Sequence, residues 1–167
     1  RFRASASVSF AAMPQAAAAV RAISQAGLFP SNCRLLDPLE ALVNGVGNGS
    51  TALLVLAFES ADHPLQAWMS RALELVADHG GRWDQASVER SMATAAVAAQ
   101  EEGEHRRGAA GDWRNQFLRA PYYRNYLTPA GLILDTFETA ITWDRFDAFY
   151  AGVRERVGKL LKEVSGA

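Results

Sequence analysis

The residues best suited to bind an anion lie in the stretch Arg119–Asp144. This stretch contains three tyrosines together with Arg124, Asp135, Glu138 and Trp143. A guanidinium is planar and permanently charged, so it can hold a carboxylate or a phosphate through two parallel hydrogen bonds. Arg124 therefore predicts an anion site, although a salt bridge to Asp135 or Glu138 would explain it equally well. The residues alone leave these two interpretations balanced.

Metal binding and nucleophilic catalysis have weaker support. The histidines His63, His79 and His105 are scattered, and none stands at metal-ligand spacing from a suitable partner, so we expect no metal site. Cys33 lies in a predicted apolar strand with no helix N-terminus after it, which favours a buried structural thiol over a nucleophile. The glycine-rich stretch Asn44–Ser50 has the wrong spacing for a dinucleotide fingerprint and precedes a strand, so it predicts a flexible connection.

Composition limits the remaining functions. The chain has 167 residues, enough for one domain, with 49% hydrophobic and 21% charged residues, as in ordinary globular domains. A formal net charge of −1 gives no overall field that would attract nucleic acid or an anionic membrane. The single cysteine suits a reducing compartment and predicts a cytoplasmic location. No apolar run is long enough to span a bilayer. The strong preference for arginine over lysine is associated with bacterial proteins.

Hydrophobic periodicity predicts the elements that position these residues. Strands are predicted over Phe2–Phe10, Cys33–Leu36, Thr51–Glu59 and Gly131–Thr139. Helices are predicted from Pro14 to Gly27, over Pro64–Val76, within Ser87–Gln100, over Trp113–Tyr122 and over Trp143–Val164, with a mobile loop over Glu101–Asp112. This order indicates an α+β fold with one small antiparallel β-sheet. Its helical cover, on one face, is expected from the helices near Pro14, Pro64 and Trp143.

Three blocks of the sequence resemble the FAD-linked oxidases of the alkylglycerone-phosphate synthase group. SNCRLLDPLEAL (31–42) resembles the P-x-x-x-R-L-x-D segment, and ALLVLAFES (52–60) is similar to an apolar strand that ends in F-E. APYYRNYL…ILDTFETAITWDR (120–145) resembles the block Y-[IL]-R-D…ESFETS-x-x-WD-[RK] and is the most specific of the three. The resemblance extends over essentially the whole chain and is weakest over residues 87–111.

This resemblance implies a fold, a cofactor and a partner. Such enzymes resemble the vanillyl-alcohol oxidase flavoproteins, in which one lobe binds FAD and a cap with a ferredoxin-like antiparallel sheet covers the flavin. Residues 1–167 would form a single cap domain. The FAD-binding lobe would lie upstream, and the catalytic tyrosine and histidine cluster downstream. The isolated chain is then expected to be inactive and to bind FAD poorly. A homodimer is compatible with this organisation.

The resemblance also assigns site residues. Arg124 falls on the arginine that binds the substrate phosphate, and Arg34 on the arginine of R-L-x-D, which supports activity by shaping the flavin-facing side. Glu138 and Trp143 belong to the last block and are expected to support activity. Strand alternation places Arg34 on the opposite face from Cys33. The sequence departs from the family pattern at Asn125, Asp135-Thr136 and Thr142, which leaves the substrate open.

Three functions remain at this stage. The first is the cap of an FAD enzyme that exchanges the acyl group of an acyl-glycerone phosphate for a long-chain alcohol. The second is the cap of a flavin dehydrogenase of 2-hydroxy acids, in which Arg124 would hold a carboxylate. The third is a stand-alone ligand-binding α+β module with no chemistry of its own.

Overall fold

A computed structural model describes residues 2–97, 119, 122, 123, 125–132 and 136–166 of the chain. Backbone contacts divide the chain into two units, Arg1–Leu132 and Ile133–Ala167. The first unit holds the sheet and most of the helices, and the second holds one long helix. In the described part of the chain, no helix combines the length and apolar character needed to cross a membrane.

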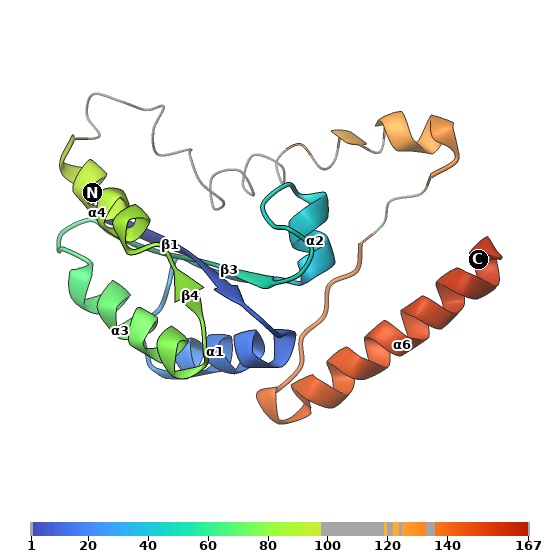
Figure 1. Cartoon of the computed structure of the whole chain (residues 1–167), viewed down its shortest axis with the longest axis horizontal. Coiled ribbons are helices and arrows are strands. Elements are labelled where there is room, and N and C mark those ends of the chain that lie inside the picture. Colours follow the sequence, from blue (N-terminus) through green and yellow to red (C-terminus); the bar gives the residue numbers. More distant parts are fainter. Residues whose placement is uncertain (1, 98–118, 120–121, 124, 133–135, 167) are drawn as a thin grey trace. The chain divides into compact units, whose positions relative to one another are not determined.

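The first unit is built on a four-stranded antiparallel sheet with the strand order β2-β3-β1-β4 (Figure 1). The strands are β1 (Phe2–Phe10), β2 (Asn32–Leu36), β3 (Ala52–Ser60) and β4 (Arg82–Trp83). The two central strands, β1 and β3, pair along their whole length, from Phe2 opposite Ser60 to Phe10 opposite Ala52. The three strands predicted in this unit are confirmed, and the short β4 is an addition. The predicted α+β fold class is confirmed as well.

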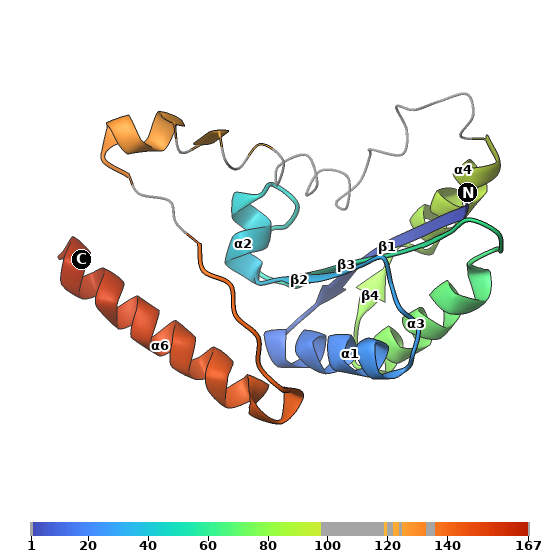
Figure 2. The ribbon, with the colours of Figure 1, turned by 180° about the vertical axis from the view of Figure 1, so that it is seen from behind.

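Helices α1 (Met13–Gln25) and α3 (Gln66–Asp78) lie on one side of the sheet, and the short α2 (Pro38–Val43) lies on the other. The reverse view in Figure 2 shows the same arrangement. Alternate residues of β1 and β3 point toward α1 and α3 because side chains in a strand alternate between the two faces. The main core therefore consists of these strand residues and the apolar stripes of the helices: Ala4, Ala6, Val8, Phe10, Leu54, Leu56, Phe58, Ala16, Ala19, Ile23, Met69, Ala72 and Val76.

Helix α4 (Gln85–Val97) protects an edge of the sheet. β4 pairs with β1 only at Val8 and Ser9, so the start of β1 needs another partner. The Ser5 backbone N–H donates a hydrogen bond to Ser91 Oγ of α4 at 2.9 Å, and this hydroxyl also lies 3.1 Å from the Ser5 carbonyl oxygen. Val88 of α4 is buried in the main core. The side chain of Ser91 thus replaces strand pairing where β1 would otherwise be exposed.

Two glycines set the turn between α3 and β4. Gly80 has φ +78°, a left-handed conformation that favours glycine. A Cβ added to Gly81 would lie 2.4 Å from Val76 Cγ1 and 2.9 Å from the Phe10 ring. Because no side chain fits there, the backbone can pass directly against the core and enter β4.

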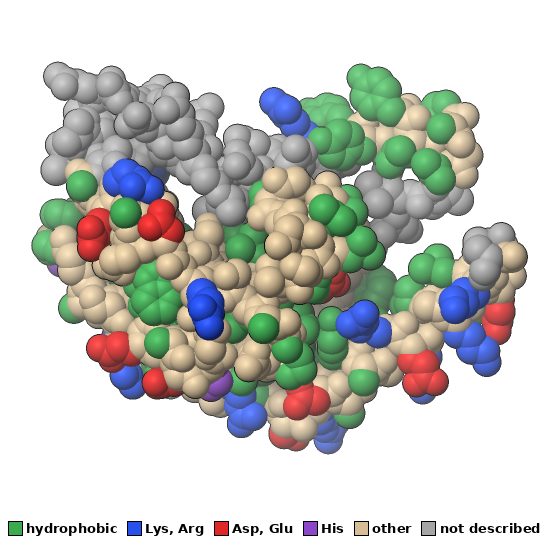
Figure 3. All heavy atoms as spheres, viewed as in Figure 1, with side chains coloured by type: hydrophobic (Ala, Val, Ile, Leu, Met, Phe, Trp, Pro, Cys, Tyr) green, Lys and Arg blue, Asp and Glu red, His purple; other side chains and the backbone are tan. Residues whose placement is uncertain are grey.

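The second unit consists of the one-turn helix η3 (Trp143–Arg145) and α6 (Phe146–Ser165). Together they confirm the helix predicted over Trp143–Val164. The Phe146 and Tyr150 rings stack with their centroids 5.9 Å apart, and the Arg154 guanidinium lies 5.6 Å from the Tyr150 ring centroid. Charged side chains of both signs line α6 (Figure 3).

The strand predicted over Gly131–Thr139 is wrong in its described residues. The one-turn helix η2 (Thr128–Ala130) ends at Gly131, which has φ +79°, and Thr136–Thr142 has no regular structure. A strand requires a backbone partner, and none of the described strands pairs with this segment. The predicted loop over Glu101–Asp112 lies outside the described residues. Of the predicted helix over Trp113–Tyr122, only Arg119 and Tyr122 are described, and both are helical.

Candidate functional site

The candidate site lies on the sheet face that points away from α1 and α3, which we call the second face. Its residues alternate with those of the main core: Asn32, Arg34 and Leu36 of β2; Leu53, Val55, Ala57 and Glu59 of β3; Arg3, Ser5, Ser7 and Ser9 of β1; and Arg82 of β4. In the register, Arg34 is opposite Val55, which is opposite Ser7. The apolar residues Leu53, Val55 and Ala57 of β3 therefore lie between Arg34 on one side and the serine hydroxyl groups of β1 on the other.

Arg34 occupies the position on this face that strand alternation predicts. Cys33 and Leu35 pack against the main core, whereas Arg34 shares the second face with Leu36. The Arg34 side chain is 44% exposed, and its Nη2 lies 3.6 Å from Glu40 Oε1 of α2. The guanidinium is therefore both next to an acid and accessible to a ligand.

Helix α2 determines where Glu40 lies. Asp37 precedes the helix, and its Oδ1 accepts hydrogen bonds from the Leu39 and Glu40 backbone N–H groups at 2.8 and 2.9 Å. Pro38 takes the first helical position, where its missing N–H is not needed. Buried Ala41 packs with Leu36, Leu53 and Val55 of the second face. These contacts hold α2 on the sheet with Glu40 next to Arg34.

Opposing effects set the protonation of Glu40. Burial raises the pKa of its carboxyl group, the positive charge of Arg34 lowers it, and the negative charge of Asp37 raises it again. The net direction is upward, so the ionised form is less favoured here than in water. At 3.6 Å, the contact to Arg34 is longer than the roughly 2.8 Å of a strong charge-assisted hydrogen bond. The pair is therefore loose, and we expect it to contribute little to stability.

Ser60, Asp62 and His63 form a turn that contains the residue types of a catalytic triad without its geometry. Ser60 Oγ and Asp62 Oδ1 lie 2.8 and 2.7 Å from the same ring nitrogen, His63 Nδ1. A triad needs the serine and the acid on opposite ring nitrogens, so these contacts organise the turn before α3 instead. Hydrogen bonds from His63 and Ser60 lower the pKa of Asp62. Among the described residues, no group of three or more His, Cys, Asp or Glu side chains could hold a metal ion.

Cys33 is packed on the core side of β2, and burial raises the pKa of its thiol to about 11. At pH 8 such a thiol is ionised in only about one molecule in a thousand, whereas an ordinary cysteine with a pKa near 8.5 is about one-quarter ionised. We therefore expect iodoacetamide to alkylate Cys33 at least about a hundredfold more slowly in the folded chain than in the denatured chain. Mass spectrometry of timed samples measures both rates, and folded-state alkylation within tenfold of the denatured rate would contradict this.

The protein-family model described as "FAD linked oxidases, C-terminal domain" matches residues 1–166 of the chain. The chain belongs to this family. No match is found among the curated proteins. As an FAD-linked oxidase C-terminal domain, the chain is the cap domain of a larger FAD-linked enzyme. Membership decides against the stand-alone binding module that the sequence had left open.

The described residues of this C-terminal domain do not form a cradle for the dinucleotide of FAD. The glycine-rich loop after α2 leads into β3, not into the helix N-terminus that would face a pyrophosphate. Gly47 of this loop is in contact with α2, because a Cβ added there would lie 2.7 Å from Ala41 Cβ. The small size of Gly47 is thus explained by packing, and no phosphate-binding role is needed.

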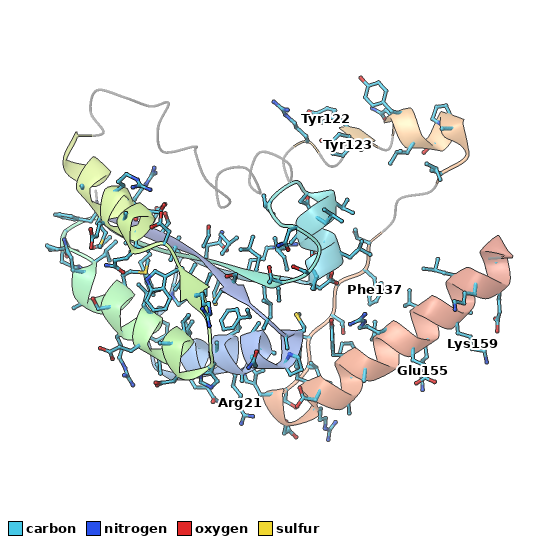
Figure 4. All side chains as sticks on the ribbon, in the orientation of Figure 1. Arg21, Tyr122, Tyr123, Phe137, Glu155 and Lys159 are labelled. Atoms are coloured by element: carbon cyan, nitrogen blue, oxygen red, sulfur yellow. The ribbon has the colours of Figure 1, made fainter. Side chains whose placement is uncertain are left out.

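The other predicted site residues are Arg124, Glu138 and Trp143. Arg124 is outside the described residues, and its neighbours Tyr122 and Tyr123 are exposed (Figure 4). Glu138 lies exposed in the irregular segment of the second unit. Trp143 begins η3, and its half-buried ring packs against Phe146 with a centroid distance of 5.6 Å. Only Arg34 has a described charged neighbour, and that neighbour was not singled out from the sequence.

The sequence contains a signal for Glu40 that the prediction missed. Asp37-Pro38 follows the predicted strand Cys33–Leu36, and an acidic residue followed by proline is the pattern of a helix N-cap and first helical position. Glu40, three residues after Asp37, completes a helix-start signature. Applied to residues 37–43, this signature predicts α2, whereas the proximity of Glu40 to Arg34 depends on how α2 packs on the sheet.

Proposed function

We propose that this domain faces the substrate of an FAD-dependent enzyme that exchanges the acyl group of an acyl-glycerone phosphate for a long-chain alcohol in ether-lipid synthesis. The observation that carries the proposal is the accessible Arg34 guanidinium on the second face, in the R-L-x-D segment on which the family resemblance rests. A cap domain needs one sheet face for its own core and one for the site. The split between the main core and the second face supports this division.

The residues of this chain would bind and orient the substrate, and none of them would be catalytic. Arg34 would contact an acidic group of the substrate on the second face, since a guanidinium forms strong hydrogen bonds to anions. Arg124 would hold the phosphate, and Glu138 and Trp143 would support the site. We propose a cytoplasmic location for the enzyme. FAD, held by the remainder of the enzyme, supplies the chemistry of the reaction.

A second candidate is the oxidation of a 2-hydroxy acid, and the Arg34–Glu40 pair favours it. The charges of Arg34 and Glu40 largely cancel, which suits a single carboxylate better than a doubly charged phosphate. A 2-hydroxy acid carries one carboxylate next to the carbon that is oxidised. In the acyl exchange, the acyl-glycerone phosphate substrate carries a phosphate instead, and only the released fatty acid carries one carboxylate.

Assays of the complete enzyme separate the two candidates. With acyl-glycerone phosphate and hexadecanol, the first candidate predicts alkyl-glycerone phosphate and free fatty acid without reduction of an added electron acceptor. With a panel of 2-hydroxy acids, the second predicts reduction of the dye 2,6-dichlorophenolindophenol. An enzyme loaded with FAD that turns over neither class would contradict both proposals.

A further inference from the structure

We propose that Glu40 selects the charge of the ligand that Arg34 accepts, so that a carboxylate monoanion binds more readily than a phosphate dianion. This inference rests on the proposed role of Arg34 as a substrate contact. It adds a specificity-determining residue outside the R-L-x-D motif. It also names the ligand chemistry of the second face.

Arg34 and Glu40 are close enough to act on the same bound anion. Glu40 Oε1 lies 3.6 Å from Arg34 Nη2, and the two side chains are 40% and 44% exposed. An anion that forms hydrogen bonds with this guanidinium must lie within a few ångströms of the Glu40 carboxylate. The anion therefore feels the attraction of Arg34 and the repulsion of Glu40 together.

The charge of the ligand determines how strongly Glu40 repels it and how strongly Arg34 attracts it. The Coulomb energy is proportional to the product of the charges, so the repulsion by Glu40 is twice as large for a dianion as for a monoanion. Without Glu40, the attraction by Arg34 would favour the dianion in the same proportion. With Glu40 in place, the pair has almost no net charge. Directional hydrogen bonds then decide binding, and a planar carboxylate matches the guanidinium fork.

The backbone that carries Glu40 is held in place beside β2. The Glu40 backbone N–H is hydrogen-bonded to Asp37 Oδ1 at 2.9 Å, and neighbouring Ala41 is fully buried against the sheet. The Val46 backbone N–H donates to the Ala41 carbonyl oxygen at 2.9 Å and fixes the loop that follows. The helix therefore keeps the Glu40 side chain within reach of Arg34. The acid next to Arg34 is thus built into the site.

The experiment uses the complete FAD-loaded enzyme with hexanoate and hexyl phosphate as matched probes at pH 8, where they are a monoanion and largely a dianion. Dissociation constants are measured by isothermal titration calorimetry for the wild type and Glu40→Gln, which removes the charge and keeps the size. A half-exposed pair contributes up to about a fivefold change in affinity for each unit of ligand charge. Glu40→Gln should therefore tighten hexanoate binding about two- to fivefold and hexyl phosphate binding about four- to twenty-fivefold.

Glu74→Gln is the matched control. Glu74 lies on α3, on the opposite side of the sheet from the second face, in an ion pair with Arg71 at 2.8 Å. Its substitution should leave the ratio of the two dissociation constants unchanged. Flavin content and melting temperature, measured for each variant, show that the enzyme remains folded. If Glu40→Gln does not fold, Glu40→Asp, which retains the charge on a shorter chain, should shift the ratio in the same direction by less.

The Arg34→Gln variant tests the anion contact by Arg34 separately from the charge selection by Glu40. If Arg34→Gln weakens both probes while Glu40→Gln leaves their ratio unchanged, charge selection by Glu40 is overturned and Arg34 remains an anion contact. If Arg34→Gln changes neither affinity, Arg34 is not the contact, and its role in the proposed function fails as well. Selective tightening of hexyl phosphate in Glu40→Gln that disappears in the double variant supports the inference.

Discussion

Phe10→Ala is expected to lower the free energy of unfolding of the chain by about 3–5 kcal/mol, the usual range for removal of a fully buried aromatic ring. Phe10 is 1% exposed at the end of β1, between the sheet and α3. Its ring is next to Gly81, where a Cβ would come within 2.9 Å. Since the backbone at Gly81 is already in close contact with the core, it has little freedom to move into the cavity. The loss of unfolding free energy should therefore include the full cost of the unfilled cavity.

Phe2→Ala on the same strand is the matched control. Phe2 is 36% exposed, so its truncation removes much less buried surface and should cost less than about 1.5 kcal/mol. Chemical denaturation followed by tryptophan fluorescence measures both variants against the wild type. Equal losses for Phe10→Ala and Phe2→Ala would show that the core is not placed as described.

Arg34→Gln is expected to reduce kcat/KM of the complete enzyme at least about tenfold, because a charge-assisted hydrogen bond contributes about 1.5–3 kcal/mol and each 1.4 kcal/mol corresponds to one decade. Arg34→Lys keeps the charge but loses the planar fork, so it should retain an intermediate activity. The melting temperature should change little, since the ion pair to Glu40 is half-exposed.

Arg71→Gln is a suitable control for this variant. Arg71 also forms a half-exposed ion pair, to Glu74 at 2.8 Å, but it lies on α3 on the opposite side of the sheet. Steady-state kinetics with the preferred substrate should show no change for Arg71→Gln. A loss of thermal stability in Arg34→Gln with normal kinetics would mean that Arg34 has only a structural role.

Most of the first unit could be predicted from the sequence because its elements carry their own signals. β1 and β3 have uninterrupted alternating or apolar patterns, and α1 ends before a glycine in a left-handed conformation. The face occupied by Arg34 followed from the parity of β2 alone. These features depend on residues close together in the sequence, and a single sequence contains that information.

The remaining features depend on contacts that a periodic pattern does not encode. The apolar residues of Gly131–Thr139 are compatible with a strand, but a pattern cannot supply the second strand that would pair with it. Helix α2 has only six residues, too few to show a periodicity, and it is stabilised by its cap and by Ala41. The link between Arg34 and Glu40 arises only when α2 folds back onto the sheet.

The most direct test of the central claim is a crystal structure of the complete enzyme with FAD and a bound carboxylate ligand such as hexanoate. We expect the second face to point toward the flavin and the Arg34 guanidinium to lie about 3 Å from the ligand carboxylate, within hydrogen-bonding distance. A structure in which the second face points into solvent, with the ligand held by other residues and Arg34 in contact only with water and Glu40, would contradict this claim.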